Sequence, residues 1–189
     1  MKISSPLAAA LMLASLVGFQ AQAGTRQVLD ANGQSHTVPD APQRVVVLSE
    51  LDLDSALTLG VQPVGTANGR GQSTLPRYLL DKAGKEIAVV GDLDNPNLEK
   101  LIDLEPDLIL TGQTKPELLA LLKEIAPTVV TGNWGEPWKT VFNRSANVMN
   151  KEAEAKAFLA RYDARLAQAR SKLAKHQGEQ VSIVRWNPK

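Results

Sequence analysis

Short runs of β-branched and aliphatic residues recur along the middle of the chain, each followed by a stretch with helical spacing. Val45–Leu48 is the first such run, and Leu53 and Ala56 follow it one helical turn apart. An unbroken apolar run of this length is typical of a strand buried on both faces, as in a parallel sheet. About five such strands alternate with helices over residues 44–131. The pattern predicts one α/β lobe with a doubly wound parallel sheet.

Capping and turn residues mark where these elements begin and end. Gly60 stands where the first helix should stop, and Asn97 is expected to cap a later helix that ends before Pro106. Pro116 stands at the start of the next helix. Ahead of the lobe, the Asn32-Gly33 pair lies between two short polar-apolar alternations, which predicts a small hairpin.

The chain changes character after residue 131. The stretch "GNWGEPWKTVF" carries Trp134 and Trp138 and is expected to be a turn-rich connection. A long alanine-rich helix is expected over 151–175, with an apolar side, and "VSIV" then reads as a new strand. We therefore expect an N-terminal α/β lobe over 24–137, a connecting helical segment over 138–178, and the first strand of a C-terminal lobe over 179–189.

Residues 1–23 read as a cleaved signal peptide. Lys2 precedes an apolar stretch of about 13 residues, shorter than the roughly 20 that a membrane-spanning helix needs, and Ala21-Gln22-Ala23 fits a signal-peptidase site. The chain contains no cysteine, so no lipidated cysteine is expected to follow the cleavage site. We expect a periplasmic protein that has no lipid anchor and does not span the membrane.

The composition and motifs favour binding over catalysis. A formal net charge of +1 gives no reason to expect attraction to nucleic acid. The two histidines have no partners at zinc spacing, and neither a nucleophile elbow nor a phosphate loop is present. The stretch "NGRGQST" at 68–74 has only part of a dinucleotide-binding motif and is better explained as a turn. The chain is therefore expected not to be an enzyme and to use no cofactor or protein-bound metal.

Several polar and aromatic residues follow the carboxyl ends of the expected strands, where α/β sheets bind ligands. Glu50, Arg70 and Trp134 are the main candidates, and Tyr78 stands in the first turn of a following helix. Each also has a simpler local explanation. Glu50 suits the dipole of a helix N-terminus, Arg70 could be a solvated loop charge, and Trp134, Trp138 and Tyr78 could serve packing.

The order of five sequence segments resembles that of the periplasmic substrate-binding proteins of iron-siderophore ABC importers. The segments are the signal peptide, "PQRVVVLSELDLDSALTLGVQPVGTA", "VGDLDNPNLEKLIDLEPDLILTG", "LLKEIAPTVV", and a long alanine-rich helix that leads into "VSIVRWNP". The most specific piece is Asn97-Leu98-Glu99 followed by "EPDLIL". The resemblance implies a two-lobed monomer whose lobes are joined by a rigid helix and bind a ferric siderophore in the cleft between them.

The resemblance also implies roles for individual residues. Glu99 would dock on an arginine of the inner-membrane ABC permease. Arg70 and Arg185 would donate hydrogen bonds to the oxygens of the iron chelate, and Trp134 and Tyr78 would cover its apolar parts. Members continue through a whole second lobe, so we expect this chain to be a fragment. Haem or cobalamin binding within the same architecture is an alternative, and an exported α/β enzyme that uses the 68–74 loop is another.

Overall fold

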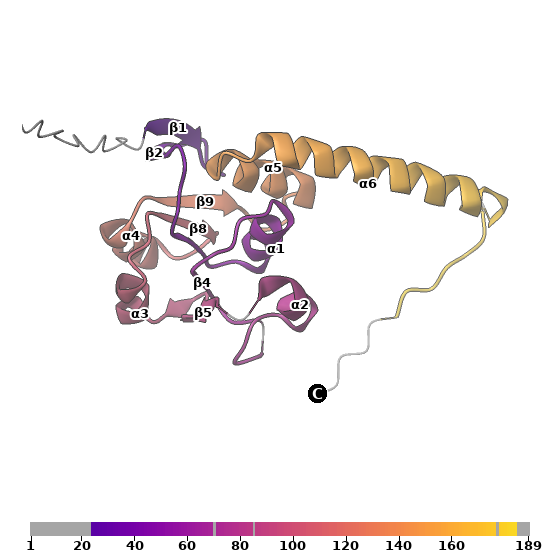
Figure 1. Cartoon of the computed structure of the whole chain (residues 1–189). Coiled ribbons are helices and arrows are strands. Elements are labelled where there is room, and N and C mark those ends of the chain that lie inside the picture. Colours follow the sequence, from indigo (N-terminus) through magenta and orange to yellow (C-terminus); the bar gives the residue numbers. More distant parts are fainter. Residues whose placement is uncertain (1–23, 70, 85, 177, 185–189) are drawn as a thin grey trace, which may run out of the picture.

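The computed structural model describes residues 24–69, 71–84, 86–176 and 178–184. A five-stranded sheet lies at its centre (Figure 1). Its strands are β3 (Val45–Val47), β4 (Gly65–Thr66), β5 (Ala88–Val89), β8 (Leu108–Gly112) and β9 (Thr128–Gly132). They lie in the order β5-β4-β3-β8-β9, and every pairing is parallel. The predicted α/β class and parallel sheet are confirmed.

Six α-helices and two short 3-10 helices, η1 and η2, connect and extend the described strands. They are α1 (Glu50–Thr58), η1 (Arg77–Leu79), α2 (Leu80–Ala83), α3 (Leu98–Asp103), α4 (Pro116–Ile125), α5 (Trp138–Val148), α6 (Glu152–Leu173) and η2 (Ala174–His176). The residues expected to begin or end helices lie at helix ends. Asn97 accepts a hydrogen bond from the Lys100 N–H at the start of α3, Pro116 begins α4, and Gly60 has a φ of 76° just after α1.

Alternate side chains of β3 enter two separate cores, as expected for a strand buried on both faces. Val45 and Val47 pack in the core that holds the buried faces of α1 and α5. Val46 packs in the other core with Leu101 of α3 and Leu122 of α4. The sheet is therefore covered by helices on both faces, which confirms the doubly wound arrangement.

Two small hairpins lie outside the central sheet. The predicted N-terminal hairpin is formed by β1 (Thr25–Leu29) and β2 (Ser35–Pro39), with Gly33 at positive φ in its turn. The Ala31 N–H donates to the Val130 carbonyl at 2.8 Å, which ties this turn to β9. The second hairpin was not predicted, and it is formed by β6 (Gly91–Asp92) and β7 (Asn95–Pro96) just before α3.

Aromatic side chains hold the long helix α6 against α5. The Phe142 and Phe158 ring centroids lie 5.2 Å apart, and those of Trp138 and Tyr162 lie 5.1 Å apart in an edge-on arrangement. The Lys139 ammonium lies 4.8 Å from the Tyr162 centroid and 2.7 Å from the Asp163 carboxylate. These contacts reach along α6 no further than Asp163, and they show that Trp138 serves helix packing.

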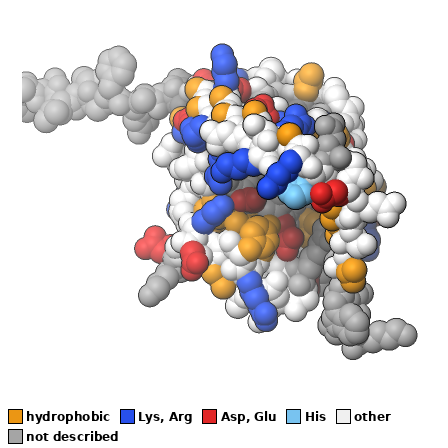
Figure 2. All heavy atoms as spheres, turned by 90° about the vertical axis from the view of Figure 1, so that its right-hand side faces the viewer, with side chains coloured by type: hydrophobic (Ala, Val, Ile, Leu, Met, Phe, Trp, Pro, Cys, Tyr) orange, Lys and Arg blue, Asp and Glu red, His pale blue; other side chains and the backbone are white. Residues whose placement is uncertain are grey.

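The second half of α6 projects away from the sheet and its helices (Figure 1). Figure 2 faces this side of the molecule and shows Lys and Arg side chains gathered there. Leu173 is exposed, and Arg170 and Lys172 stand in the last turn. The long helix predicted over 151–175 is present as α6, which is followed by η2.

The predicted strand at the end of the chain is not formed over the residues described. Val181–Val184 have no regular secondary structure, and Val181 and Ile183 are exposed. A strand needs a neighbouring strand to complete its hydrogen bonds, and none of the described segments pairs with this one. The expected signal peptide over 1–23, together with Arg70 and Arg185, lies outside the described residues.

Candidate functional site

The carboxyl edge of the sheet is built around its topological switch point. β3 and β8 are neighbours, and the strands that follow each of them in sequence lie on opposite sides of this pair. Connections therefore leave β3 and β8 in opposite directions, and ligands of open α/β sheets bind at the carboxyl ends of two such strands. Ser49 and Glu50 follow β3, and Gln113 follows β8. The loop that carries Trp134 follows β9, next to β8.

The candidate residues that the structure describes differ in their position at this edge and in their exposure. Glu50 is the first residue of α1 and is half-buried. Tyr78 lies in η1, in the connection after β4, with 62% of its surface exposed. Trp134 is 82% exposed. Glu99 is exposed in the first turn of α3, on the opposite face of the sheet from α1 and α5. Glu50, Tyr78 and Trp134 thus come from three connections of one edge. Glu99 comes from a fourth, because the Asn97 N–H at the start of α3 donates to the Val90 carbonyl just after β5, at 2.6 Å.

An ion pair fixes the loop that carries Trp134. Arg144 of α5 donates to the Glu136 carboxylate from both terminal guanidinium nitrogens, at 2.9 and 3.1 Å. The same carboxylate accepts the Asn133 N–H at 2.7 Å. The Trp134 N–H donates a longer bond, 3.4 Å, to the Gln113 side chain. Glu136 and Arg144 were not predicted as site residues, since nothing in their spacing indicates that they pair.

A fully buried carboxylate, Asp52, lies beneath the same edge. It accepts hydrogen bonds from the hydroxyls of Ser49 at 2.5 Å, Thr131 at 2.7 Å and Ser145 at 2.7 Å. Burial raises the pKa of Asp52, although these hydroxyls and the more distant Arg144 oppose the shift. Asp52 was not predicted as a site residue either. The Ser49-x-x-Asp52 spacing of a helix-capping box could have indicated the first of these bonds, but not the burial.

The Arg144–Glu136 pair predicts a defined pH dependence. Its hydrogen bonds lower the pKa of Glu136 below the ordinary value. The pair therefore stabilises the fold above the unfolded pKa of about 4.3, and this contribution is lost as the pH falls through the folded pKa. We expect Glu136→Gln to cost roughly 1 kcal/mol at neutral pH and progressively less in acid. Urea unfolding of both proteins at several pH values measures this difference, and a cost that is constant into strong acid would contradict the prediction.

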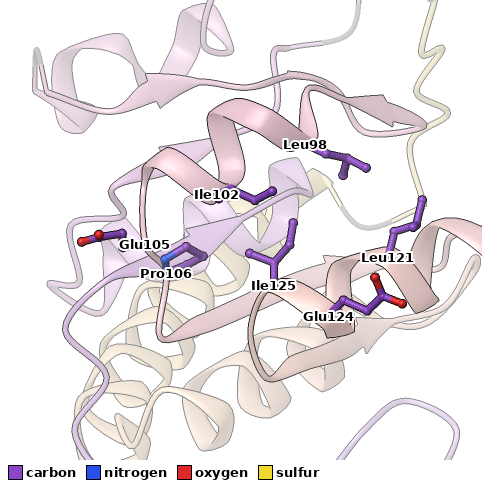
Figure 3. A pocket seen from close by; sticks show the side chains of 7 residues that line it. All are labelled: Leu98, Ile102, Glu105, Pro106, Leu121, Glu124 and Ile125. Atoms are coloured by element: carbon purple, nitrogen blue, oxygen red, sulfur yellow. The ribbon is translucent and has the colours of Figure 1, made fainter.

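Two surface grooves lie away from the loop that carries Trp134. The larger, about 420 Å³, runs between α3 and α4 (Figure 3). Its lining is apolar apart from two carboxylates: Leu98, Ile102, Glu105, Pro106, Leu121, Glu124 and Ile125. Glu105 and Pro106 lead into β8, so this groove reaches the amino end of the sheet. The second groove, about 240 Å³, lies between α1, α5 and α6 and includes Trp138.

Among the described residues, no group of three or more His, Asp or Glu side chains is placed to hold a metal ion. No helix in this part of the chain is both long and apolar enough to cross a membrane.

Known proteins resemble this chain in sequence and fold. The probable siderophore-binding lipoprotein YfiY of Bacillus subtilis is 34% identical over 163 residues, which cover 86% of this chain and 50% of YfiY. The putative ABC transporter substrate-binding lipoprotein YhfQ of the same organism is 31% identical, covering 79% of this chain and 48% of its own. Staphylococcus aureus SirA, solved in complex with staphyloferrin B, has a TM-score of 0.69 at 29% identity, covering 82% of this chain and 53% of SirA.

These comparisons correct the predicted localisation. A periplasmic protein without a lipid anchor was expected, but YfiY and YhfQ are both named as lipoproteins. That expectation is therefore wrong as stated. The absence of cysteine from the chain, on which it depended, was not a sufficient basis for it.

The sequence model of one family matches most of the chain. The model is that of the periplasmic binding proteins, and it matches residues 45–187, from β3 of the sheet to beyond α6. The chain spans about half the length of the relatives named above. On this match, the chain belongs to the periplasmic binding protein family.

Proposed function

We propose that the chain forms the ligand-binding half of a monomeric substrate-binding component of an ABC importer, and that its carboxyl edge binds a ferric siderophore. The observation that carries the proposal is the exposure of Trp134, a large aromatic side chain that is 82% exposed. Its loop is held by hydrogen bonds to the Glu136 and Gln113 side chains. Exposing such a ring costs hydrophobic free energy, which ligand binding recovers. Two comparisons support a siderophore as the class of ligand. YfiY is named as a probable siderophore-binding lipoprotein, and SirA was solved with staphyloferrin B.

The chemistry of a ferric siderophore suits this edge. The chelator supplies the iron ligands, so the protein needs to contact only the organic shell of the complex. An aromatic face covers the apolar parts of the chelator, and arginine guanidiniums donate paired hydrogen bonds to its carboxylate or hydroxamate oxygens. In this proposal Trp134 and Tyr78 are the aromatic surfaces, Arg70 and Arg185 are the donors, and Glu50 accepts hydrogen bonds from polar groups of the chelator.

A fluorescence titration tests the proposal. Ferric hydroxamate, catecholate and carboxylate siderophores are each added to the full chain, with haem, cobalamin and the iron-free chelators as comparisons. We expect one ferric class to quench tryptophan emission at micromolar concentration. Trp134→Ala should weaken this binding about tenfold, since aromatic anchors carry a large share of binding energy.

Trp138→Phe is the matched control, because Trp138 packs between α5 and α6 instead of facing the edge. Its affinity should stay within about twofold of the wild type. Quenching by haem or cobalamin alone would reject the siderophore in favour of those ligands. No binding by any compound would reject the function.

Glu99 is our proposed contact with the permease. It is exposed in the first turn of α3, and a carboxylate there can pair with a basic side chain of a docking partner. We expect Glu99→Lys to reduce stimulation of the permease ATPase in proteoliposomes at least tenfold, since a like charge would face the partner. Glu117→Lys is the matched control, because Glu117 is likewise exposed in the first turn of α4. Equal losses in the two variants would contradict a specific role for Glu99.

A further inference from the structure

The loop between β9 and α5 is tightly held although its central side chain is exposed. Two hydrogen bonds join Asn133 and Glu136, the first and last residues of the turn. The Asn133 N–H donates to the Glu136 carboxylate at 2.7 Å, and the Glu136 N–H donates to the Asn133 carbonyl at 3.3 Å. Trp134 and Gly135 lie between them, with Gly135 at a φ of 83°. The turn therefore closes on itself around Trp134, and that closure depends on the position of the Glu136 side chain.

Arg144 determines where the Glu136 side chain lies. Its guanidinium meets the carboxylate through two nitrogens, a geometry that restricts both groups to one plane. One of these nitrogens also donates to the Thr131 carbonyl at 2.5 Å. Arg144 thus joins the strand end that enters the loop to the carboxylate that closes it. The Arg144 side chain is only 17% exposed and that of Glu136 23%, so water competes little for these bonds.

Thr131 connects the same contacts to the interior of the lobe. Its carbonyl accepts from Arg144, and its hydroxyl donates to the buried Asp52 carboxylate. Ser145, the next residue along α5, donates to Asp52 as well, at 2.7 Å. The loop that carries Trp134 is therefore fixed, through Arg144, to the most buried polar cluster described at this edge.

We propose that Arg144 is a positioning residue for ligand binding, which acts through Glu136 to hold the Trp134 ring in its binding orientation before the ligand arrives. The proposal rests on the function proposed above. An aromatic ring on a loose loop would lose conformational freedom on binding, and this loss would subtract from affinity. A loop already ordered in the free protein avoids that loss. Arg144 touches no ligand in this arrangement, and its effect on affinity requires Trp134.

The dependence on Trp134 separates positioning from general structural support. Arg144→Lys keeps the charge but replaces a planar fork with a single flexible ammonium, which cannot reach the Thr131 carbonyl and both carboxylate oxygens in the same geometry. A residue that only supports the fold would alter affinity equally whether or not Trp134 is present. A positioning residue would alter affinity only when Trp134 is present, so the two substitutions would be coupled.

Two measurements on the full chain test the proposal. The first is the heteronuclear NOE of the Trp134 backbone amide and indole N–H in the ligand-free protein, which reports motion on the picosecond to nanosecond scale. Arg144→Lys and Glu136→Gln should both lower it. The second is a double-mutant cycle on affinity for the ferric siderophore found by the titration. Arg144→Lys should weaken binding about tenfold in the wild type and less than twofold in the Trp134→Ala background.

Arg165→Lys, at an exposed arginine of α6, is the matched control and should change neither quantity. Circular dichroism confirms that each variant is folded, and Glu136→Gln replaces Arg144→Lys in the cycle if the latter is not. Unchanged NOE values, or equal losses of affinity in the two backgrounds, would overturn the proposal. If no ferric siderophore binds the wild type, both the proposed function and the role of Arg144 in ligand binding are rejected. The NOE values then still show whether Arg144 orders the loop.

Discussion

Replacing Phe142 with alanine is expected to lower the free energy of unfolding by about 4 kcal/mol, because a buried aromatic side chain is removed from a packed core. Phe142 is 5% exposed and belongs to the core between the sheet and α5. Its ring also contacts Phe158, so the variant loses part of the attachment of α6. Urea unfolding followed by circular dichroism measures the change.

Trp134→Ala is the matched control for this prediction. It also deletes a large aromatic ring, but from an exposed loop, so its effect on stability should stay below about 0.5 kcal/mol. A loss below 1 kcal/mol for Phe142→Ala, or equal losses in both variants, would contradict the packing described here.

Replacing Asp52 with alanine is expected to cost about 2 kcal/mol, since three hydrogen bonds to a buried carboxylate are lost at once. The cost is moderated because the Thr131 and Ser145 hydroxyls have backbone acceptors nearby, and because an ionised carboxylate no longer has to be buried. Thermal and urea unfolding measure it. Asp54→Ala on the same helix removes an exposed carboxylate that lies 3.8 Å from Lys82, and it should cost less than about 0.5 kcal/mol.

The pH dependence gives a second test of Asp52. Its pKa is raised in the folded protein, so the folded state binds this proton more tightly than the unfolded state. The stability that the proton contributes is present below the unfolded pKa of about 3.9 and is lost as the pH rises through the folded pKa. The stability advantage of the wild type over Asp52→Asn should therefore be larger in acid than at neutral pH. An advantage that grows with pH would show that the carboxylate is instead favoured in its ionised form.

The elements of the sheet could be predicted because their signals are local. A strand buried on both faces needs consecutive apolar residues, as at Val45–Val47, and helix ends need particular residues such as Asn97 and Gly60. Helix α5 was not predicted as a separate helix. Its first residues fell in the expected turn-rich connection, and all of it fell in the helical segment expected over 138–178. It begins after a Gly-Pro-rich turn and buries a serine, Ser145, in its core-facing side, which masks the apolar pattern.

The site could be predicted only where it depends on strand ends. The sheet places Glu50 and Trp134 at its carboxyl edge whatever their partners are, so topology alone indicated both. Which of Trp134 and Trp138 is the more exposed depends on the packing of α5 against α6, which no spacing in the sequence encodes. The hydrogen bonds of the Asp52 cluster join residues up to 93 positions apart, so these residues could not be recognised as partners from the sequence. The strand expected over 181–184 depended on pairing with a neighbouring strand, and none of the described segments provides one.

Equilibrium dialysis with radioactive iron tests ferric-siderophore binding at this edge most directly. The full chain, Trp134→Ala and Trp138→Phe are each dialysed against iron-55-loaded siderophores of the hydroxamate, catecholate and carboxylate classes. We predict that the wild type and Trp138→Phe retain one ferric siderophore per chain at micromolar concentration, and that Trp134→Ala retains it about tenfold more weakly. Equal retention by Trp134→Ala and the wild type, or no retention of any ferric siderophore by the wild type, would contradict binding at the carboxyl edge.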